Sequence, residues 1–147
     1  MKTLLLDIDY TIMDGNHPRP HLKSFIERIR QTHRIVFYTA GTHLRVADCL
    51  RVMRHQLGID DINFIRQLQR SALCRENCPM VKVGGVEIKC FDKASLMLNV
   101  PVEDLILLDD NPSYDHPHTK QVIQAKGWMY DYAGDNDDYL LHLVIPE

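Results

Sequence analysis

Three short apolar runs, at residues 4–6, 35–38 and 105–108, predict the strands of a buried sheet. Uninterrupted apolar runs of this length are typical of parallel strands covered on both faces. Apolar residues three or four positions apart predict a helix after each of the first two runs. The first helix ends near His33, and its buried face is Leu22, Phe25, Ile26 and Ile29. The second lies between an N-cap at Thr42 and a terminating Gly58, and its buried stripe is Leu44, Ala47, Leu50, Met53 and Leu57.

Residues 60–90 interrupt this alternation of strands and helices. Side chains of alternating character over residues 80–89 flank Gly84 and Gly85, a pair suited to a two-residue hairpin turn. We therefore expect a small antiparallel insertion here, with residues 62–65 as a further strand.

The last third of the chain predicts three more helices and one more strand. The first of these helices has Asp92 as its N-cap and Lys93 in its first turn, and buries Leu96, Met97 and Val100. Residues 119–125 are expected to be helical and residues 127–130 extended. A closing helix that contains Leu140, Leu141 and Val144 follows the acidic residues of segment 135–138.

This order of elements predicts an α/β fold with a Rossmann-like parallel sheet, helices on both faces and right-handed crossovers. A chain of 147 residues has the size of one domain, so we expect a single domain over residues 1–147 with a small β insertion at about 60–90. Only a few residues separate the first strand from the first helix, which leaves no room for a large cap there.

The composition is that of an ordinary soluble globule, with 45% hydrophobic and 25% charged residues and a net charge of −3. No apolar run reaches membrane-spanning length, and no secretory signal pattern opens the sequence. The charge is uneven, because residues 1–75 carry a net +5 and residues 76–147 a net −8. The arginines between Arg45 and Arg75 are either solvated helix faces or a basic rim for a phosphorylated or acidic substrate. Aromatic residues are not interleaved with them, so nucleic-acid binding is not expected.

Pairs of carboxylates follow the first and third apolar runs. Asp7 and Asp9 lie on the same side of an extended segment, and Asp109 is adjacent to Asp110. Ligands in an open α/β sheet bind at the carboxyl ends of the strands, and clustered like charges there require a compensating cation or proton. Oxygen ligands of this kind suit Mg²⁺.

Thr39 follows the second apolar run in the same way. Its hydroxyl group and the free backbone N–H groups at the start of the next helix, at Ala40 and Gly41, form a natural cradle for phosphate oxygens. Taken alone, a threonine at this place is also an ordinary turn or cap residue.

These residues resemble the motifs of the haloacid dehalogenase superfamily. The segment 7–11 has the pattern Asp-x-Asp-x-Thr, and Asp109 and Asp110 match the last acidic motif. The phrase 37–40, Phe-Tyr-Thr-Ala, is especially similar to the phosphatases that act on the carboxy-terminal domain of RNA polymerase II, the FCP/SCP family. That family carries an insertion beside its active site, so hairpin 80–89 is either a wall for substrate recognition or an edge hairpin that only covers core.

The resemblance implies a role for each motif residue. Asp7 is the nucleophile, Asp9 the general acid and base, and Thr39 and Lys93 stabilise the transferring phosphoryl group. Lys93 is preferred to Lys82 and Lys89 because it stands at a predicted helix start. The residues of the Mg²⁺ site are Asp7, Asp9 through its carbonyl oxygen, Asp109 and Asp110, where Asp110 either holds a metal-bound water or lies behind the direct ligands. The remaining candidates for phosphate or substrate binding are Thr11, Ala40, Gly41 and Tyr10, where Tyr10 replaces a smaller or acidic residue and narrows the mouth.

The implied activity is a Mg²⁺-dependent phosphatase that forms an aspartyl-phosphate, with phosphoserine or phosphothreonine protein as the substrate. A phosphatase for small molecules, nucleotides or polynucleotide ends has the same motifs, and a non-catalytic binding module on the same fold is a further alternative. We expect a cytoplasmic monomer or weak oligomer without membrane contact, nuclear if eukaryotic.

The cysteines offer a different metal site. Cys74, Cys78 and Cys90 are expected to be reduced thiols. Together with His116 and His118 they could supply zinc ligands, but the spacing of the cysteines is looser than in the usual zinc-binding patterns, so a zinc site is not favoured. The two histidines are expected to be exposed, with at most one of them lining the pocket.

Overall fold

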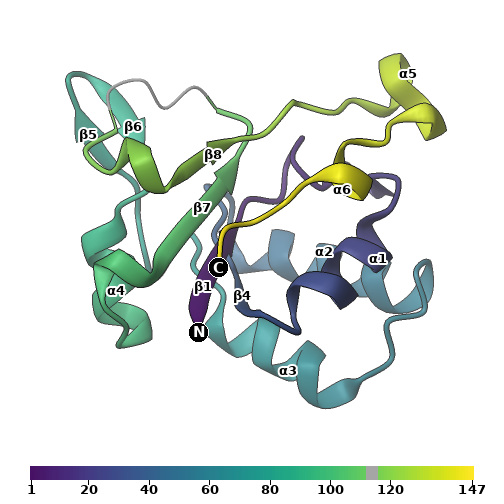
Figure 1. Cartoon of the computed structure of the whole chain (residues 1–147), viewed down its shortest axis with the longest axis horizontal. Helices are drawn as coiled ribbons and strands as arrows, with labels where there is room; N and C mark the ends of the chain where they lie inside the picture. Colours follow the sequence, from purple (N-terminus) through teal and green to yellow (C-terminus); the bar gives the residue numbers. More distant parts are fainter. Residues whose placement is uncertain (112–115) are drawn as a thin grey trace.

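The centre of the molecule is a four-stranded parallel sheet. The computed structural model describes residues 1–111 and 116–147 (Figure 1). The sheet has the strand order β4 (His33–Phe37), β1 (Lys2–Leu6), β7 (Leu105–Asp109) and β8 (Val122–Gln124). All three pairings are parallel, so the carboxyl ends of the strands share one edge. The α/β prediction is confirmed.

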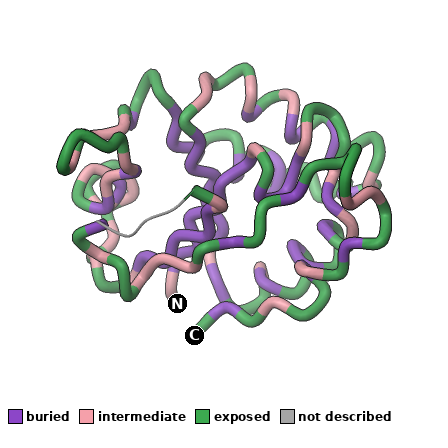
Figure 2. Tube along the Cα trace, turned by 90° about the horizontal axis from the view of Figure 1, so that it is seen from above, coloured by how far each residue is buried: buried purple, intermediate pink, exposed green. Residues whose placement is uncertain are grey.

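The two faces of the sheet bury alternate residues of the same strands. Leu4 and Leu6 of β1 pack with the helices α1 (Leu22–Ile29), α2 (His43–His55), α3 (Ile62–Ser71) and α6 (Tyr139–His142). Leu5 faces the other side, in a smaller cluster with Phe91 and Ala94 of α4 (Phe91–Leu98). Figure 2 shows the buried residues concentrated along the central strands, with exposed residues around them. Helices on both faces are therefore confirmed.

Two hairpins lie outside the sheet. The first joins β2 (Met13–Asp14) to β3 (His17–Pro18), directly after the first carboxylate pair. The second joins β5 (Val81–Val83) to β6 (Val86–Ile88), as the sequence predicted. Its turn residues Gly84 and Gly85 have φ angles of +58° and +82°, which side chains rarely tolerate.

The remaining elements are short and lie in the last third of the chain. They are η1 (Val102–Asp104), η2 (Thr119–Gln121), α5 (Tyr130–Ala133) and η3 (Gly134–Asn136). Within the described ranges, no helix is both long and apolar enough to cross a membrane.

The expected strand at 62–65 is wrong, because this segment is the first turn of α3. The Asp61 carboxylate caps the helix by accepting a hydrogen bond from the Phe64 N–H at 3.2 Å. Phe64, Ile65 and Leu68 then fall on one helical face and are buried. A cap followed by helical spacing outweighs the β propensity of the two isoleucines.

The helices α2 and α4 bury different residues from those that the sequence predicted. In α2 the structure buries Val46 and Cys49, whereas Leu44 is 65% exposed and Ala47 is exposed as well. α4 begins at Phe91 with Cys90 as its N-cap, so Asp92 is not the cap. Because Phe91 and Ala94 face the sheet, Leu96 and Met97 point outward, and Leu96 is 84% exposed.

The helix predicted at 119–125 and the strand predicted at 127–130 are also wrong. Residues 119–125 form η2 and strand β8 rather than a helix, and the segment at 127–130 is not a strand. β8 gains its backbone partners from β7, and a segment of only three residues is too short to reveal this pairing in the sequence. Leu140 of the closing helix is buried as expected, but Leu141 and Val144 are exposed.

A buried ion pair fastens this terminal segment to the first loop. The Arg19 guanidinium binds the Asp137 carboxylate through Nε at 2.8 Å and Nη2 at 3.1 Å. Its remaining nitrogen, Nη1, donates to the carbonyl oxygens of Thr11 and Lys126 at 2.9 and 2.7 Å. The pair thus links the loop that carries Thr11 to residues more than a hundred positions away.

We expect Asp137→Ala to destabilise the fold by about 3 kcal/mol, because it leaves the buried Arg19 charge without its partner. Urea unfolding monitored by circular dichroism measures the loss, with Asp138→Ala as the control because that carboxylate is exposed. Burial raises the pKa of Asp137, but the Arg19 hydrogen bonds and charge outweigh burial and lower it. The contribution is therefore present above about pH 4 and disappears as the pH falls through the lowered pKa. Equal destabilisation by the two substitutions would contradict this role.

Candidate active site

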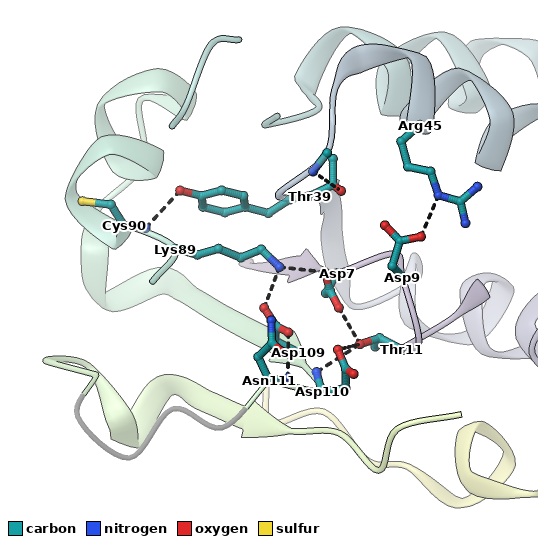
Figure 3. A network of polar contacts seen from close by, with 12 residues as sticks. Asp7, Asp9, Thr11, Thr39, Arg45, Lys89, Cys90, Asp109, Asp110 and Asn111 are labelled. Atoms are coloured by element: carbon teal, nitrogen blue, oxygen red, sulfur yellow. Dashed lines mark hydrogen bonds and ion pairs between the residues drawn. The ribbon is translucent and has the colours of Figure 1, made fainter. Parts of the chain in front are cut away.

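The carboxyl edge of the sheet brings together the predicted motif residues of three strands. Asp7 follows the last residue of β1, Asp109 ends β7, and Thr39 stands two residues beyond β4. Figure 3 shows their side chains converging at this edge together with Thr11 and Lys89. The parallel register explains the convergence, because Leu6 pairs with Phe37 on one side and Leu108 on the other.

Asp7 is buried and has a partner for each carboxylate oxygen. Oδ2 accepts a hydrogen bond from the Thr11 hydroxyl at 2.7 Å, and Oδ1 accepts one from the Lys89 ammonium at 2.7 Å. The same ammonium lies 2.5 Å from Oδ2 of Asp109. One buried cation therefore bridges two carboxylates that would otherwise repel each other.

The structure brings Lys89 to Asp7, whereas the sequence analysis predicted Lys93 for this role. Lys89 leaves the hairpin directly after β6, in extended chain that runs into the site. Lys93 is the third residue of α4, because the helix begins two residues earlier than the sequence suggested, and no hydrogen bond or ion pair joins its ammonium to a described site residue. The Tyr38 hydroxyl fixes the approach of the Lys89 segment by accepting from the Cys90 N–H at 3.0 Å.

His116 holds the same segment from the other side, so the expectation that both histidines are exposed is wrong. Its Nε2 lies 2.9 Å from the Lys89 carbonyl oxygen, and its Nδ1 accepts a hydrogen bond from the His118 N–H at 3.0 Å. These partners require a proton on Nε2 and none on Nδ1. Burial lowers the pKa of His116, which also favours the neutral ring.

Carboxylates of Asp7, Asp109 and Asp110 form a group able to hold a metal ion. They offer oxygen atoms that all lie within 4.8 Å of one another, and they are the one such group of acidic, His or Cys side chains among the described residues. Thr11 braces the group, since its Oγ1 accepts from the Asp110 N–H at 3.1 Å while its hydroxyl proton faces Asp7. An all-oxygen set fits a hard divalent cation such as Mg²⁺.

The electrostatics of the site depend on burial. Burial raises the pKa of Asp7 to about 8, and the negative Asp109 adds to this effect while the Lys89 ammonium opposes it. Burial lowers the pKa of Lys89, but the two carboxylates outweigh burial and raise it, so the ammonium stays charged. A divalent cation among the carboxylates favours the ionised form of Asp7.

Asp9 points away from this group, toward α2. Its Oδ1 accepts a hydrogen bond from Arg45 Nε at 2.7 Å, and Arg45 Nη2 binds the Gly15 carbonyl oxygen at 2.9 Å (Figure 3). The Asp9 side chain is 44% exposed, as suits a group that exchanges protons with solvent. Sequence reasoning missed Arg45, whose one signal was its place in the first turn of the helix after Thr39.

Thr39 is buried and shapes the turn before α2. Its Oγ1 accepts from the Gly41 N–H at 3.0 Å. A Cβ on Gly41 would come within 3.3 Å of both Thr39 Oγ1 and Arg45 Cβ, so a larger residue crowds this turn. Ala40 lies between the two residues, at the carboxyl edge where phosphate oxygens were expected.

Tyr10 has a positive φ of 62° and an exposed ring at the rim of the site. Its carbonyl oxygen accepts from the Trp128 N–H at 2.8 Å. The left-handed backbone conformation of Tyr10 turns the chain so that the Thr11 hydroxyl group reaches Asp7.

Two cysteines of the suggested zinc set pack away from the carboxylates. Cys74 and Cys78 are buried, and the Cys78 thiol lies 3.3 Å from the Tyr38 hydroxyl. The Cys78 thiol and the Cys90 N–H therefore both contact the Tyr38 hydroxyl group.

Comparison with known proteins identifies the family. The family model for NLI interacting factor-like phosphatases matches residues 2–146. The chain belongs to the NLI interacting factor-like phosphatase family. As a member it is a phosphoric monoester hydrolase, which the sequence motifs predicted.

Two curated relatives are similar at low identity. Nuclear envelope morphology protein 1 of Schizosaccharomyces pombe is 24% identical over 97% of this chain and 32% of its own length. CTD nuclear envelope phosphatase 1 of Xenopus tropicalis is 26% identical over 87% of this chain and 45% of its own. The chain therefore spans less than half the length of either protein.

The geometry predicts opposite effects for two lysines in the same short segment. Lys89→Met removes the cation between Asp7 and Asp109 and should lower kcat by at least about 100-fold. Lys93→Met should leave kcat within about twofold, because its amino group is outside the site. Steady-state assays with an aryl phosphate, with circular dichroism to verify folding, make the comparison. A large loss of kcat in Lys93→Met, with none in Lys89→Met, would contradict this assignment and support Lys93 instead.

Proposed function

We propose that the chain is a Mg²⁺-dependent phosphatase that removes phosphate from phosphoserine or phosphothreonine of a protein through an aspartyl-phosphate at Asp7. The observation that carries this proposal is the setting of Asp7, which has an ammonium on one oxygen and a hydroxyl group on the other. Two further carboxylates lie close enough to share a cation with it.

The proposed metal ligands are the carboxylates of Asp7, Asp109 and Asp110 with the carbonyl oxygen of Asp9. Bound there, Mg²⁺ neutralises charge on the phosphoryl oxygens. The protein's own contribution is to orient the Asp7 carboxylate through Thr11 and Lys89, whose hydrogen bonds favour its ionised form against the effect of burial.

Asp7 attacks phosphorus in line, its new bond forms as the bond to the leaving oxygen breaks, and Asp9 gives that oxygen a proton. Asp9 then takes a proton from water, which attacks the same phosphorus. Inorganic phosphate leaves, and the Asp7 carboxylate is regenerated. The structure supports this role because Arg45 holds the Asp9 side chain at a position that is 44% exposed to solvent.

The Lys89 ammonium, the Thr39 hydroxyl group and the Ala40 N–H are proposed to stabilise the equatorial oxygens of the transferring group, whereas the expected Gly41 N–H already donates to Thr39 Oγ1. Lys89 is the best placed of these donors, since its ammonium already contacts the nucleophile.

A protein substrate is favoured by the surroundings of the site. The strands of the β2–β3 hairpin, after the first motif, have two residues each and provide no large cap. A cavity of about 280 Å³ lies beside Ala40 and is lined by Arg75, Pro79, Met80 and Glu87 at the base and side of the β5–β6 hairpin. We propose that this hairpin contacts residues next to the phosphorylated side chain.

The relatives bear on the target and the location. The names of both relatives refer to the nuclear envelope, and that of one describes a CTD phosphatase. These names favour a phosphoprotein substrate and make a nuclear location a reasonable proposal beside the cytoplasmic prediction.

The direct test measures Mg²⁺-dependent phosphate release from an aryl phosphate and from a phosphoserine peptide. Asp7→Asn should lower both rates by at least about a thousandfold, because the amide is not a nucleophile. Asp48→Asn, on the exposed surface of α2, should not change them. Faster turnover of the peptide supports the protein substrate, whereas release by Asp7→Asn at the wild-type rate would refute the mechanism.

Metal removal provides a separate prediction. A chelator should abolish turnover, and added Mg²⁺ should restore it. Asp110→Asn should raise the Mg²⁺ concentration for half-maximal activity by about tenfold, because one carboxylate charge leaves the ligand group. The same substitution at Asp104, outside the group, should have no effect on this concentration. Full activity in the chelator would exclude the metal role.

A further inference from the structure

A second cavity lies beside β4 and shares no lining residue with the group around Asp7. Its volume is about 470 Å³, and its walls come from β4, α3, the segment 72–77 and the end of α4. Arg34, in its wall, is the second residue of β4, whereas the catalytic turn follows the end of that strand. Figure 1 shows α3 and α4 on either side of the amino-terminal end of β1, away from the carboxyl edge.

The charge of this cavity is entirely positive. Among the residues that the structure describes, three arginines, Arg34, Arg66 and Arg70, line it, and no acidic residue does. Within the described part of the chain, none of their guanidinium groups forms an ion pair or a hydrogen bond. Arg66 and Arg70 are one turn apart on α3, where like charges repel each other. An anion in the cavity relieves that repulsion.

The uncharged part of the wall adds features that a simple anion site does not need. Asn63 and Gln67 carry amide groups that can both donate and accept hydrogen bonds. Met97, which is half exposed, and Leu98 supply an apolar patch at the α4 side. The cavity therefore combines charged, amide and apolar surfaces within one hollow.

We propose that this cavity is a docking site for an acidic segment of a partner polypeptide. Carboxylates of the segment bind the arginines, its backbone meets the amide side chains, and one apolar side chain packs against Met97. The overall charge of the protein is −3, so attraction of an acidic peptide must come from this local group of arginines.

Other occupants fit less well. A small inorganic anion would use the arginines and leave the apolar patch bare. Single-stranded nucleic acid stacks its bases on aromatic side chains, and none of the cavity's described lining residues is aromatic.

The test is fluorescence anisotropy of a labelled peptide in which glutamates surround one leucine, titrated with the full chain. Arg66→Gln/Arg70→Gln should weaken binding by about tenfold or more, because two charge-assisted contacts are lost. Arg51→Gln/Arg54→Gln on α2 removes the same charge from exposed positions outside the cavity and should leave the affinity within about twofold. Both variants should keep the wild-type melting temperature and aryl phosphatase activity, since none of the four residues touches the catalytic site.

The peptide with glutamine in place of glutamate should bind far more weakly, and added salt should weaken binding of the acidic peptide. Equal weakening by the two arginine pairs would overturn the proposal, since it would show only general charge attraction. Binding of the glutamine peptide with the same affinity would overturn it as well. Displacement of the peptide by equimolar inorganic phosphate, or tighter binding of an oligonucleotide, would assign the cavity to another ligand.

Discussion

The burial of Asp7 beside Asp109 is the constraint on which the rest of the site depends. Two carboxylates removed from water repel each other, and burial, with Asp109 adding to it, raises the pKa of Asp7 to about 8 even though Lys89 opposes the rise. The Lys89 ammonium supplies one compensating charge. With Asp110, three carboxylates face one ammonium, which leaves two negative charges for a divalent cation to balance. The charge of this site therefore supports the proposed metal-assisted phosphoryl transfer.

The fold holds these charges in place from several directions. The parallel strands β1 and β7 deliver Asp7 and Asp109 side by side, since Leu6 pairs with Leu108. Tyr38 and His116 hold the backbone on either side of the Lys89 side chain. Arg19 ties the Thr11 loop to Asp137 in the terminal segment. Contacts distant in sequence therefore stabilise a site whose reacting groups stand at strand ends.

The sequence revealed the strand-end residues because their signals are local. Asp7, Thr39 and Asp109 each follow an apolar run, and parallel strands bring such positions together. Lys89 was hidden because its choice over Lys93 depends on where α4 begins, and the sulfur of Cys90 is an uncommon N-cap. Arg45 and His116 were missed because their roles arise from tertiary contacts. β8 was missed because its three residues become a strand by pairing with β7.

The central claim is that Asp7 carries the phosphoryl group during turnover, and chemical trapping tests it most directly. Acid quenching during turnover followed by borohydride reduction converts an aspartyl-phosphate to homoserine, which peptide mass spectrometry locates. The account predicts homoserine at position 7 and none at position 9 or 109. Homoserine at Asp9 or Asp109 instead would contradict the assignment of the nucleophile.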